Sequence, residues 1–449
     1  MLTLLFFVLL TTVLVSLEII RYEQAKGRVN HLAVGAVENL MADYQPDMAN
    51  WYDIYTLDMD YLGQGKEVAN NRVWNYLENN LLNVDLLGRE RGFYHFTVVD
   101  AQVEPVKYLY DEGCLPLKEQ IHNWVVESFV PTKKRIKRES VKKMSKNQSS
   151  FDAPTSGAVP EGVDPRGVMN EIKRLGILTV TANDGLPLSK ESHRLEGLPS
   201  KSLSWNPVSN TLLDKAQEKT ELELYILGHF QSALSMTREE ETAYSNEIEY
   251  LITGKSSDYD CLERVAKEIV ALRLPINTAS IMKDSSKKGE AGVAAGIICA
   301  ITVQPEIYEE VKQGILLAWA FGESVADVKS LLQGEKVPLV KNSDNWKLSF
   351  HQLFSIKSSQ GKESKEGLEY EDYLKLLLMM RSEKHLYMRM LDLMELNIHL
   401  KYPEFQIENC ITSYHLTSEI DVDRRFYQLP FQKGKQYKFY IAQDGNYQF

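Results

Sequence analysis

The sequence predicts a predominantly helical α+β protein: an N-terminal transmembrane helix continues as an amphipathic stem, and a mostly helical body with a few antiparallel strands follows. Three observations predict this class. Residues 1–17 contain no charged side chain. Apolar residues then recur at three- and four-residue spacing as far as residue 44. Beyond residue 213 the helical period dominates, and only the last forty residues alternate as strands do.

The composition describes an ordinary globular chain that is long enough for two or three compact units. It has 449 residues, of which 44% are hydrophobic and 25% charged. The formal net charge is −11. This acidic balance argues against nucleic acid as a partner, because phosphate binding requires a basic face.

The first segment, 1–45, is predicted to be a membrane helix and its stem. Seventeen uncharged residues span about 25 Å, which is just short of a bilayer core. We therefore expect Met1–Ile20 to contact the lipid bilayer, with Glu18 and Arg21 reaching toward the headgroups. A cleaved signal peptide is the rival interpretation, but no Lys or Arg precedes the apolar run and no small-x-small site follows it. The same helix is expected to continue to Tyr44, over about 65 Å in total.

Three further segments are predicted after the stem: an α+β part at 46–130, a basic and then Ser/Pro/Gly-rich linker at 131–212, and a mostly helical domain at 213–449. In the α+β part we expect a helix at 72–82, a strand within 92–110 and a helix at 116–130. The aromatic residues at 46–62 are expected to pack against the stem, with a place at the membrane surface as the alternative. The basic stretch at 133–146 is interpreted as a solvated helix tail leading into the linker, with contact to anionic lipid or to nucleic acid as the alternatives.

In the last segment, apolar periodicity predicts helices around 222–234 and 262–272, the second ending near Pro275. Residues 291–303 are predicted to form a buried helix that packs closely through Gly292 and Gly296. Further helices are expected from Pro305 to Gly334, at 369–380 and at 383–400. Strands are predicted at 409–421, 425–429 and 436–442, the last two forming a hairpin.

No catalytic, cofactor-binding or metal-binding residue can be assigned from the sequence. It contains no GxxxxGK[ST] phosphate loop, no HExxH pair and no GxSxG elbow. His385 and His399 would lie about 21 Å apart on one straight helix, too far to share a metal. The cysteines, Cys114, Cys261, Cys299 and Cys410, are interpreted as small buried hydrophobic residues, and one long-range disulfide stays open if the body is extracytoplasmic.

Several strings resemble an uncharacterised bacterial membrane-protein family of Firmicutes, a domain of unknown function related to TadE/TadG-like proteins of tight-adherence (Flp) pilus systems. The resemblance rests on the apolar run with Glu18, Arg21 and Ala25, then Leu40, Ala42-Asp43-Tyr44 and Leu57-Asp58, Leu227–Phe230 with Ser232–Leu234, Glu247–Lys255, Lys336–Leu339, Tyr370–Leu374 and Leu391–Asn397. It covers most of the chain outside the linker. The strings EIEYLITGK and YEDYL are fairly specific together and weak singly.

The resemblance implies a single-pass protein of the cell membrane with its body outside the cytoplasm, in contact with other envelope or pilus-assembly proteins. It assigns no activity and no cofactor. Family members usually begin with a short Gly/Ser-containing leader, which this sequence lacks. Pilins keep a glutamate near the start of the apolar run, whereas Glu18 lies at its end, so pilin-like polymerisation is not implied.

The sequence therefore leaves three functions open. The first is a structural or assembly component of the envelope, which the stem helix and the resemblance favour. The second is a membrane-tethered hydrolase, which would need a cleft with converging groups of perturbed pKa. The third is a ligand- or partner-binding module, which a large pocket or apolar patch would favour.

Overall fold

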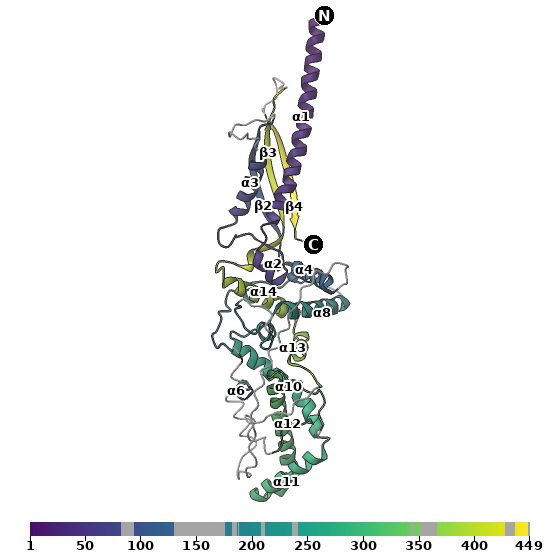
Figure 1. Ribbon diagram of the computed structural model, residues 1–449, viewed down its shortest axis with the longest axis vertical. Coiled ribbons are helices and arrows are strands. Elements are labelled where there is room, and N and C mark those ends of the chain that lie inside the picture. Colours follow the sequence, from purple (N-terminus) through teal and green to yellow (C-terminus); the bar gives the residue numbers. More distant parts are fainter. Residues whose placement is uncertain are drawn as a thin grey trace. The chain divides into compact units, whose positions relative to one another are not determined.

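The computed structural model describes residues 1–81, 94–129, 176–181, 186, 188–207, 212–235, 241–342, 345–350, 366–426 and 436–447. The chain forms two compact units (Figure 1). The first, here called the sheet unit, comprises residues 1–129, 196–225 and 390–449. The second, the helical unit, comprises residues 130–195 and 226–389. The predicted class, α+β and predominantly helical, is confirmed.

The sheet unit contains four antiparallel strands around one long central strand. β3 (Cys410–Asp423) pairs along one edge with β2 (Phe96–Tyr108) and along the other with β4 (Gln436–Asn446) and the short β1 (Leu57–Asp58). The predicted pairing of strand 436–442 with strand 425–429 in a hairpin is wrong. Strand β4 pairs instead with Ser413–Asp423 of β3. Local alternation predicts a strand but cannot choose its neighbour, which long-range packing decides.

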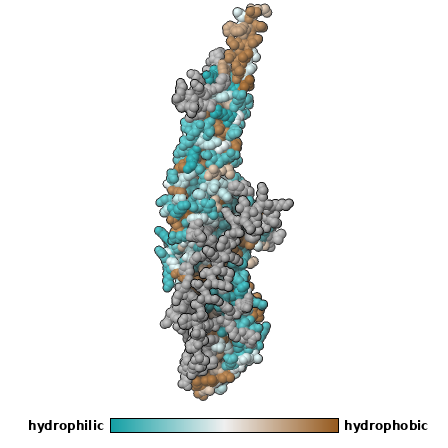
Figure 2. All heavy atoms as spheres, viewed as in Figure 1, coloured by the Kyte–Doolittle hydropathy of each residue, from teal (hydrophilic) through white to brown (hydrophobic). Residues whose placement is uncertain are grey.

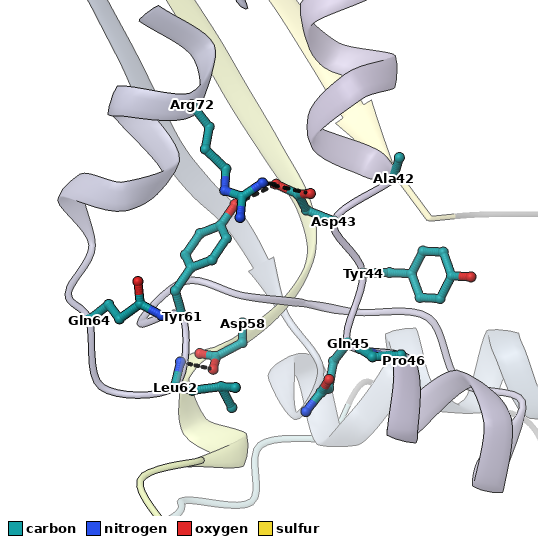
Figure 3. Close-up of a pocket in the computed structure, with 10 residues that line it drawn as sticks. All are labelled: Ala42, Asp43, Tyr44, Gln45, Pro46, Asp58, Tyr61, Leu62, Gln64 and Arg72. Atoms are coloured by element: carbon teal, nitrogen blue, oxygen red, sulfur yellow. Dashed lines mark hydrogen bonds and ion pairs between the residues drawn. The ribbon is translucent and has the colours of Figure 1, made fainter. Parts of the chain in front are cut away.

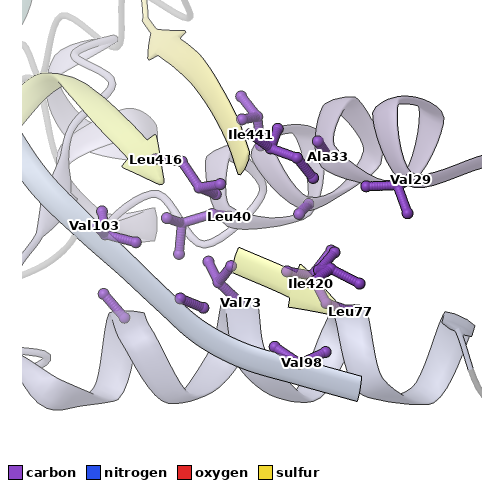
Figure 4. Close-up of a cluster of buried hydrophobic side chains, with 14 of the residues drawn as sticks. Val29, Ala33, Leu40, Val73, Leu77, Val98, Val103, Leu416, Ile420 and Ile441 are labelled. Atoms are coloured by element: carbon purple, nitrogen blue, oxygen red, sulfur yellow. The ribbon is translucent and has the colours of Figure 1, made fainter. Parts of the chain in front are cut away.

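Helix α1 (Leu2–Met41) is unbroken for 40 residues, about 60 Å, and ends where the stem was expected to end. Its second half packs on one face of the sheet, beside α3 (Glu67–Leu81). Small side chains line the buried stripe of α1, including Ala25, Ala33 and Ala36, and they let the helix approach the strands closely. Figure 4 shows this core, in which Leu40 and Ala33 of the helix lie among Leu416, Ile420 and Ile441 of the strands.

The rest of the sheet unit is built from short helices and parts of longer ones. They are α2 (Pro46–Tyr52), α4 (Asp111–Phe129), α7 (Pro199–Ser202), the part of α8 (Leu212–His229) up to Tyr225, the part of α14 (Glu383–His399) from Met390, and the 3-10 helix η4 (Ile407–Asn409). Tyr52 is fully buried between distant segments: its carbonyl oxygen accepts the Tyr225 hydroxyl, and its own hydroxyl accepts Asn397 Nδ2 at 2.8 Å. Tyr55 and Tyr61, which are partly buried, pack against the core that α1 shares with the sheet.

The helical unit consists of α6 (Leu178–Thr181), α9 (Glu247–Thr253), α10 (Asp258–Ile281), α11 (Ser285–Thr302), η1 (Pro305–Ile307), α12 (Tyr308–Leu332), α13 (Tyr370–Met379), and the ends of α8 and α14 outside the sheet unit. α10 and α11 both pack on α12. The predicted end near Pro275 is wrong, because α10 continues six residues beyond it to Ile281. Arg273 and Asn277 flank this proline and both bind Asp327 of α12, so tertiary contacts hold the helix together across it.

The predicted buried helix at 291–303 is correct on one face only. Gly292 lies against Tyr308, whose hydroxyl would be 2.7 Å from an added Cβ, so this glycine does permit close packing. Gly296 has open space around it, and Val293 and Ile297 are 68% and 57% exposed. A small and apolar composition predicts burial but does not reveal how many faces of the helix are covered.

The contacts group the chain differently from the sequence segments. Strands β3 and β4 belong with β2 and α1, although they follow the helices of 226–389 in the chain. The basic stretch at 133–146, the short helix expected around 168–175 and residues 427–429 of the expected strand lie outside the described residues.

Candidate functional site

The first half of α1 is an exposed apolar surface. Its most apolar 18-residue window has a mean hydropathy of 2.4, and only 6% of that window is buried. Figure 2 shows the brown, hydrophobic side chains gathered on the free end of this helix. Within the described part of the chain, α1 is the helix that is long and apolar enough to cross a membrane. This is compatible with a single-pass membrane anchor.

A buried ion pair marks the point where the exposed half of α1 meets the sheet. Glu18 and Arg21 are 4% and 2% exposed, and Arg21 Nη1 lies 3.3 Å from Glu18 Oε1. Arg21 also donates to the carbonyl oxygen of Asp423, at the end of β3, and the backbone N–H of Phe426 donates to Glu18 Oε2 at 2.9 Å. The expectation that both side chains reach toward lipid headgroups is therefore wrong, because the end of the sheet binds them. The apolar stretch free of the sheet is Leu2–Leu17, about 24 Å long.

A pocket of about 430 Å³ lies in the sheet unit, at the other end of α1 (Figure 3). It is lined by Ala42, Asp43, Tyr44, Gln45, Pro46, Asp58, Tyr61, Leu62, Gln64 and Arg72. Ala42-Asp43-Tyr44 and Asp58 are among the residues on which the sequence resemblance rests. The sequence therefore singled out these two strings without indicating that they share one pocket.

One wall of the pocket is an ion pair between Asp43, in the turn after α1, and Arg72 of α3. Arg72 Nη1 lies 2.9 Å from Asp43 Oδ2, and the Tyr61 hydroxyl donates to the same oxygen at 3.3 Å. The Arg72 guanidinium also lies over the Tyr61 ring, 5.3 Å from its centroid. Burial, followed by the nearby Asp43 carboxylate, raises the pKa of Tyr61, so this hydroxyl stays a donor at physiological pH.

A strained loop held by Asp58 carries Tyr61 and continues this side of the pocket. Asp58 Oδ1 accepts the N–H of Asp60 at 2.9 Å and its Oδ2 accepts the N–H of Leu62 at 2.8 Å. Tyr61 and Leu62 have φ values of 47° and 57°, in the left-handed region that bulky side chains rarely adopt. Such strain costs about 1–3 kcal/mol per residue and is concentrated at functional sites. Burial raises the pKa of Asp58, while its bonds to backbone N–H groups oppose that rise.

Two of the strings singled out by the sequence meet in the helical unit. The hydroxyl of Tyr370, from YEDYL, donates to Glu249 Oε1, from EIEYLITGK, at 2.8 Å across 121 positions of the chain. The end of the same string is fixed by Arg389, which donates to the carbonyl oxygens of Leu251 and Ile252. Gly254 follows with φ +64°, and a Cβ there would lie 2.6 Å from Arg389 Nε, so a larger residue would be strained and would displace Arg389. The strings EIEYLITGK and YEDYL are therefore specific together because their side chains bind each other in the folded chain.

Glu249 should make the stability of the chain depend on pH. Burial raises its pKa from 4.5 to about 7, although the Tyr370 hydroxyl opposes this. Because the folded state holds the proton more tightly than the unfolded state, the stabilisation is complete below about pH 4.5 and is lost as the pH rises through 7. We expect the Glu249→Gln variant, which needs no proton, to gain about 2.5 kcal/mol relative to the native chain between pH 5 and pH 8. Chemical denaturation at a series of pH values measures this difference.

The matched control for that experiment is Glu290→Gln, on the exposed side of α11. Its stability should follow the pH profile of the native chain. A Glu249→Gln profile parallel to that of the native chain would show that Glu249 is ionised throughout the range.

A buried charge network connects α10, α12 and the segment after α12. Arg273 Nη2 lies 2.9 Å from Asp327 Oδ2, and both side chains are completely buried. Lys341 bonds to Glu323 and to Asp327, and Glu323 also accepts the backbone N–H groups of Lys347 and Leu348 at 2.8 Å each. Burial raises the pKa of Glu323, and the Lys341 ammonium opposes the rise. Each of these charges has a partner, and the network holds Lys341, Lys347 and Leu348 against α12.

The chemistry-bearing side chains noted in the sequence have ordinary packing roles. All four cysteines are buried free thiols, as predicted, and burial raises the pKa of Cys114 and of Cys261 to about 12. His385 contacts Ser382, and His399 contacts the carbonyl oxygen of Phe405. Across the described ranges, no three His, Cys, Asp or Glu side chains are grouped as ligands of a metal ion would be.

Sequence reasoning did not find Gln45, Tyr61 and Arg72, which complete the pocket. They lie on a cap, a loop and a helix, and their types are common on any protein surface. The run Asp58–Gly65, with two aspartates and two glycines, was a turn signal that could have drawn attention to the loop.

Comparison with known proteins gives one match. No curated protein and no solved structure matches the chain. A family of unknown function (DUF5702) matches residues 157–422, which is more than half of the sequence and covers nearly all of the helical unit together with most of β3. The chain therefore belongs to this family of unknown function.

Proposed function

We propose that the protein is a single-pass component of the cell envelope with a structural or assembly role, of the kind played by TadE-like proteins of tight-adherence pilus systems. The observation that carries the proposal is the continuity of α1. Its first half exposes apolar side chains, and its second half is built into the core of the sheet unit. A folded unit is thereby joined to the membrane through a helix with no intervening linker. The proposed link to a pilus system rests on the sequence resemblance to TadE/TadG-like proteins.

Membrane attachment is tested by arginine substitution in the exposed half of α1. Each arginine near the centre of a membrane helix costs about 2.5–3.5 kcal/mol of insertion free energy. We expect the native chain to resist alkaline carbonate extraction of membranes, and the double variant Phe7→Arg/Leu10→Arg to appear in the soluble fraction. Val34→Arg, on the exposed side of the packed half, is the control and should stay in the membrane. Extraction of the native chain by carbonate, or cleavage after Leu17, would refute the anchor.

The position of the body and its partners are tested separately. Protease added to intact protoplasts should degrade the body, whereas full protection would place it in the cytoplasm. Co-purification of the detergent-solubilised chain with pilus-assembly proteins supports the assembly role. A chromosomal neighbourhood that lacks a secretion ATPase and a prepilin peptidase counts against it. The proposal assigns no catalysis, so hydrolysis of wall polymers by the purified chain would overturn it.

A further inference from the structure

Strand β4 has an outer edge whose backbone groups find no partner in the described part of the chain. The N–H of Tyr447, just beyond β4, donates to the carbonyl oxygen of Thr412, the residue opposite it on the β3 side. Along antiparallel strands, residues that exchange such bonds alternate with residues that face away. Because the register with β3 is unbroken, the even-numbered residues 438–444 point their N–H and C=O groups away from β3, and no described residue binds them.

The outer strand on the other side of the sheet is protected, whereas β4 is not. β2 contains Pro105 and shifts its register at three places, and the N–H of Val103 donates to Asn70 Oδ1 at 2.8 Å. Such features keep an edge from pairing with another chain. β4 runs for 11 residues without a proline or a register shift, and Tyr440 at its middle is 73% exposed. A long and regular edge of this kind is open to one further strand.

The groups on this edge determine the chemistry of what binds there. Outward N–H and C=O groups recur about every 7 Å along β4, a spacing that the backbone of an extended polypeptide matches. The exposed side chains of the same residues add a charge pattern: Lys438 is 57% exposed and positive, Asp444 is 81% exposed and negative, and Tyr440 and Ala442 lie between them. Each charge also contacts a side chain of β3, but its exposed side is open to a neighbouring strand.

A second copy of this chain does not fit the edge while both copies are anchored in one membrane. Helix α1 lies beside β4 and runs in the same direction (Figure 1): Tyr22 stacks on Phe439 with ring centroids 5.3 Å apart, and the Tyr447 hydroxyl donates to the carbonyl oxygen of Met41 at 2.9 Å. Two β4 edges related by a two-fold axis would pair antiparallel, so the apolar halves of their α1 helices would point in opposite directions. This step rests on the membrane anchor proposed above.

We propose that β4 binds an extended segment of a partner protein, which joins the sheet as an antiparallel strand. At alternate positions from its N-terminus, this segment carries a basic residue opposite Asp444, an apolar residue opposite Ala442, an aromatic residue opposite Tyr440 and an acidic residue opposite Lys438. Main-chain hydrogen bonds to the edge provide the affinity, and the alternate side chains provide the specificity.

Binding is tested on the full chain in detergent micelles with a fluorescently labelled peptide, Thr-Lys-Thr-Val-Thr-Tyr-Thr-Glu-Thr, whose alternate side chains match the edge. Fluorescence anisotropy should show binding at submillimolar concentration, and the peptide with its Lys and Glu exchanged should bind at least threefold more weakly. Hydrogen exchange should slow at the N–H groups of residues 440, 442 and 444 when the matched peptide binds. Glu104→Lys, an exposed charge change on β2, should leave the binding unchanged.

Ala442→Pro blocks the edge from the side of the protein. Proline removes the outward N–H of residue 442, whereas the bonds from β4 to β3 come from the residues on either side of it. The melting temperature should therefore stay close to that of the native chain, and binding of the matched peptide should fall at least tenfold. Ala442→Thr keeps the N–H and should bind as the native chain does.

Modified peptides make the same test independent of how the proline variant folds. N-methylation of the peptide's valine removes a donor that faces β4 and should abolish binding, whereas N-methylation of the threonine after it, whose N–H faces away, should not. Equal binding of these two peptides, or no binding of the matched peptide at millimolar concentration, would overturn the proposal. So would dimerisation of the native chain that Ala442→Pro abolishes, because a second copy would then occupy the edge. The membrane anchor is tested by carbonate extraction, so peptide binding can fail while the anchor stands.

Discussion

Replacing Arg273 with methionine is expected to lower the free energy of unfolding by about 3–5 kcal/mol. Arg273 is completely buried and bonds to Asp327 through Nε at 3.0 Å and Nη2 at 2.9 Å. Its loss would leave the carboxylates of Asp327 and Glu323 with Lys341 as their common buried cation. A buried charge without compensation is among the most destabilising defects that a single substitution can create.

Chemical denaturation of the native chain and its variants measures this effect. Arg264→Met is the matched control, since Arg264 lies on the same helix but is 57% exposed in its pair with Glu268. Exposed pairs contribute about 0–1 kcal/mol, so this change should be small. The double variant Arg273→Met/Asp327→Leu removes one charge of each sign and should lose less stability than the sum of the single variants. Equal effects of Arg273→Met and Arg264→Met would mean that the network is unimportant for stability.

Replacing Ala33 with aspartate is expected to detach the sheet from α1, with a loss of more than about 3 kcal/mol. Ala33 is completely buried in the core between the helix and the strands, beside Leu40 and Val29 on the same face. A carboxylate there would be ionised at neutral pH in the unfolded chain and would have to enter an apolar core. The cost would fall on the packed half of α1 and leave its apolar half unaltered.

The neighbouring residue provides the control. Val34 is 46% exposed on the same helix, so Val34→Asp introduces the same side chain without burying it and should change the stability by less than about 0.5 kcal/mol. Limited proteolysis of both variants in micelles reports whether the sheet stays folded on the helix. Equal resistance of the two variants would contradict the assignment of this face of α1 to the core.

The elements that the sequence predicted well are those whose signal is local. The apolar period of α1, the turn at Gly334 and the proline at the start of η1 each act within a few residues. Pro275 misled the prediction for the opposite reason: locally it ends helices, but Asp327, more than fifty positions away, binds residues on either side of it. The pocket shows the same limit. Asp43, Asp58 and Arg72 come from three separate segments, and only the fold brings them together.

For this protein, the sequence alone determined that a long helix begins with an exposed apolar half, because uncharged residues at helical spacing specify such a helix without help from the rest of the chain. The tertiary structure decided which strand β4 joins, where Glu18 and Arg21 find their partners, and that the outer edge of β4 is left without a partner in the described part of the chain. These features depend on contacts between residues tens to hundreds of positions apart. Their free energies come from burial and pairing, which exist only once the chain has folded.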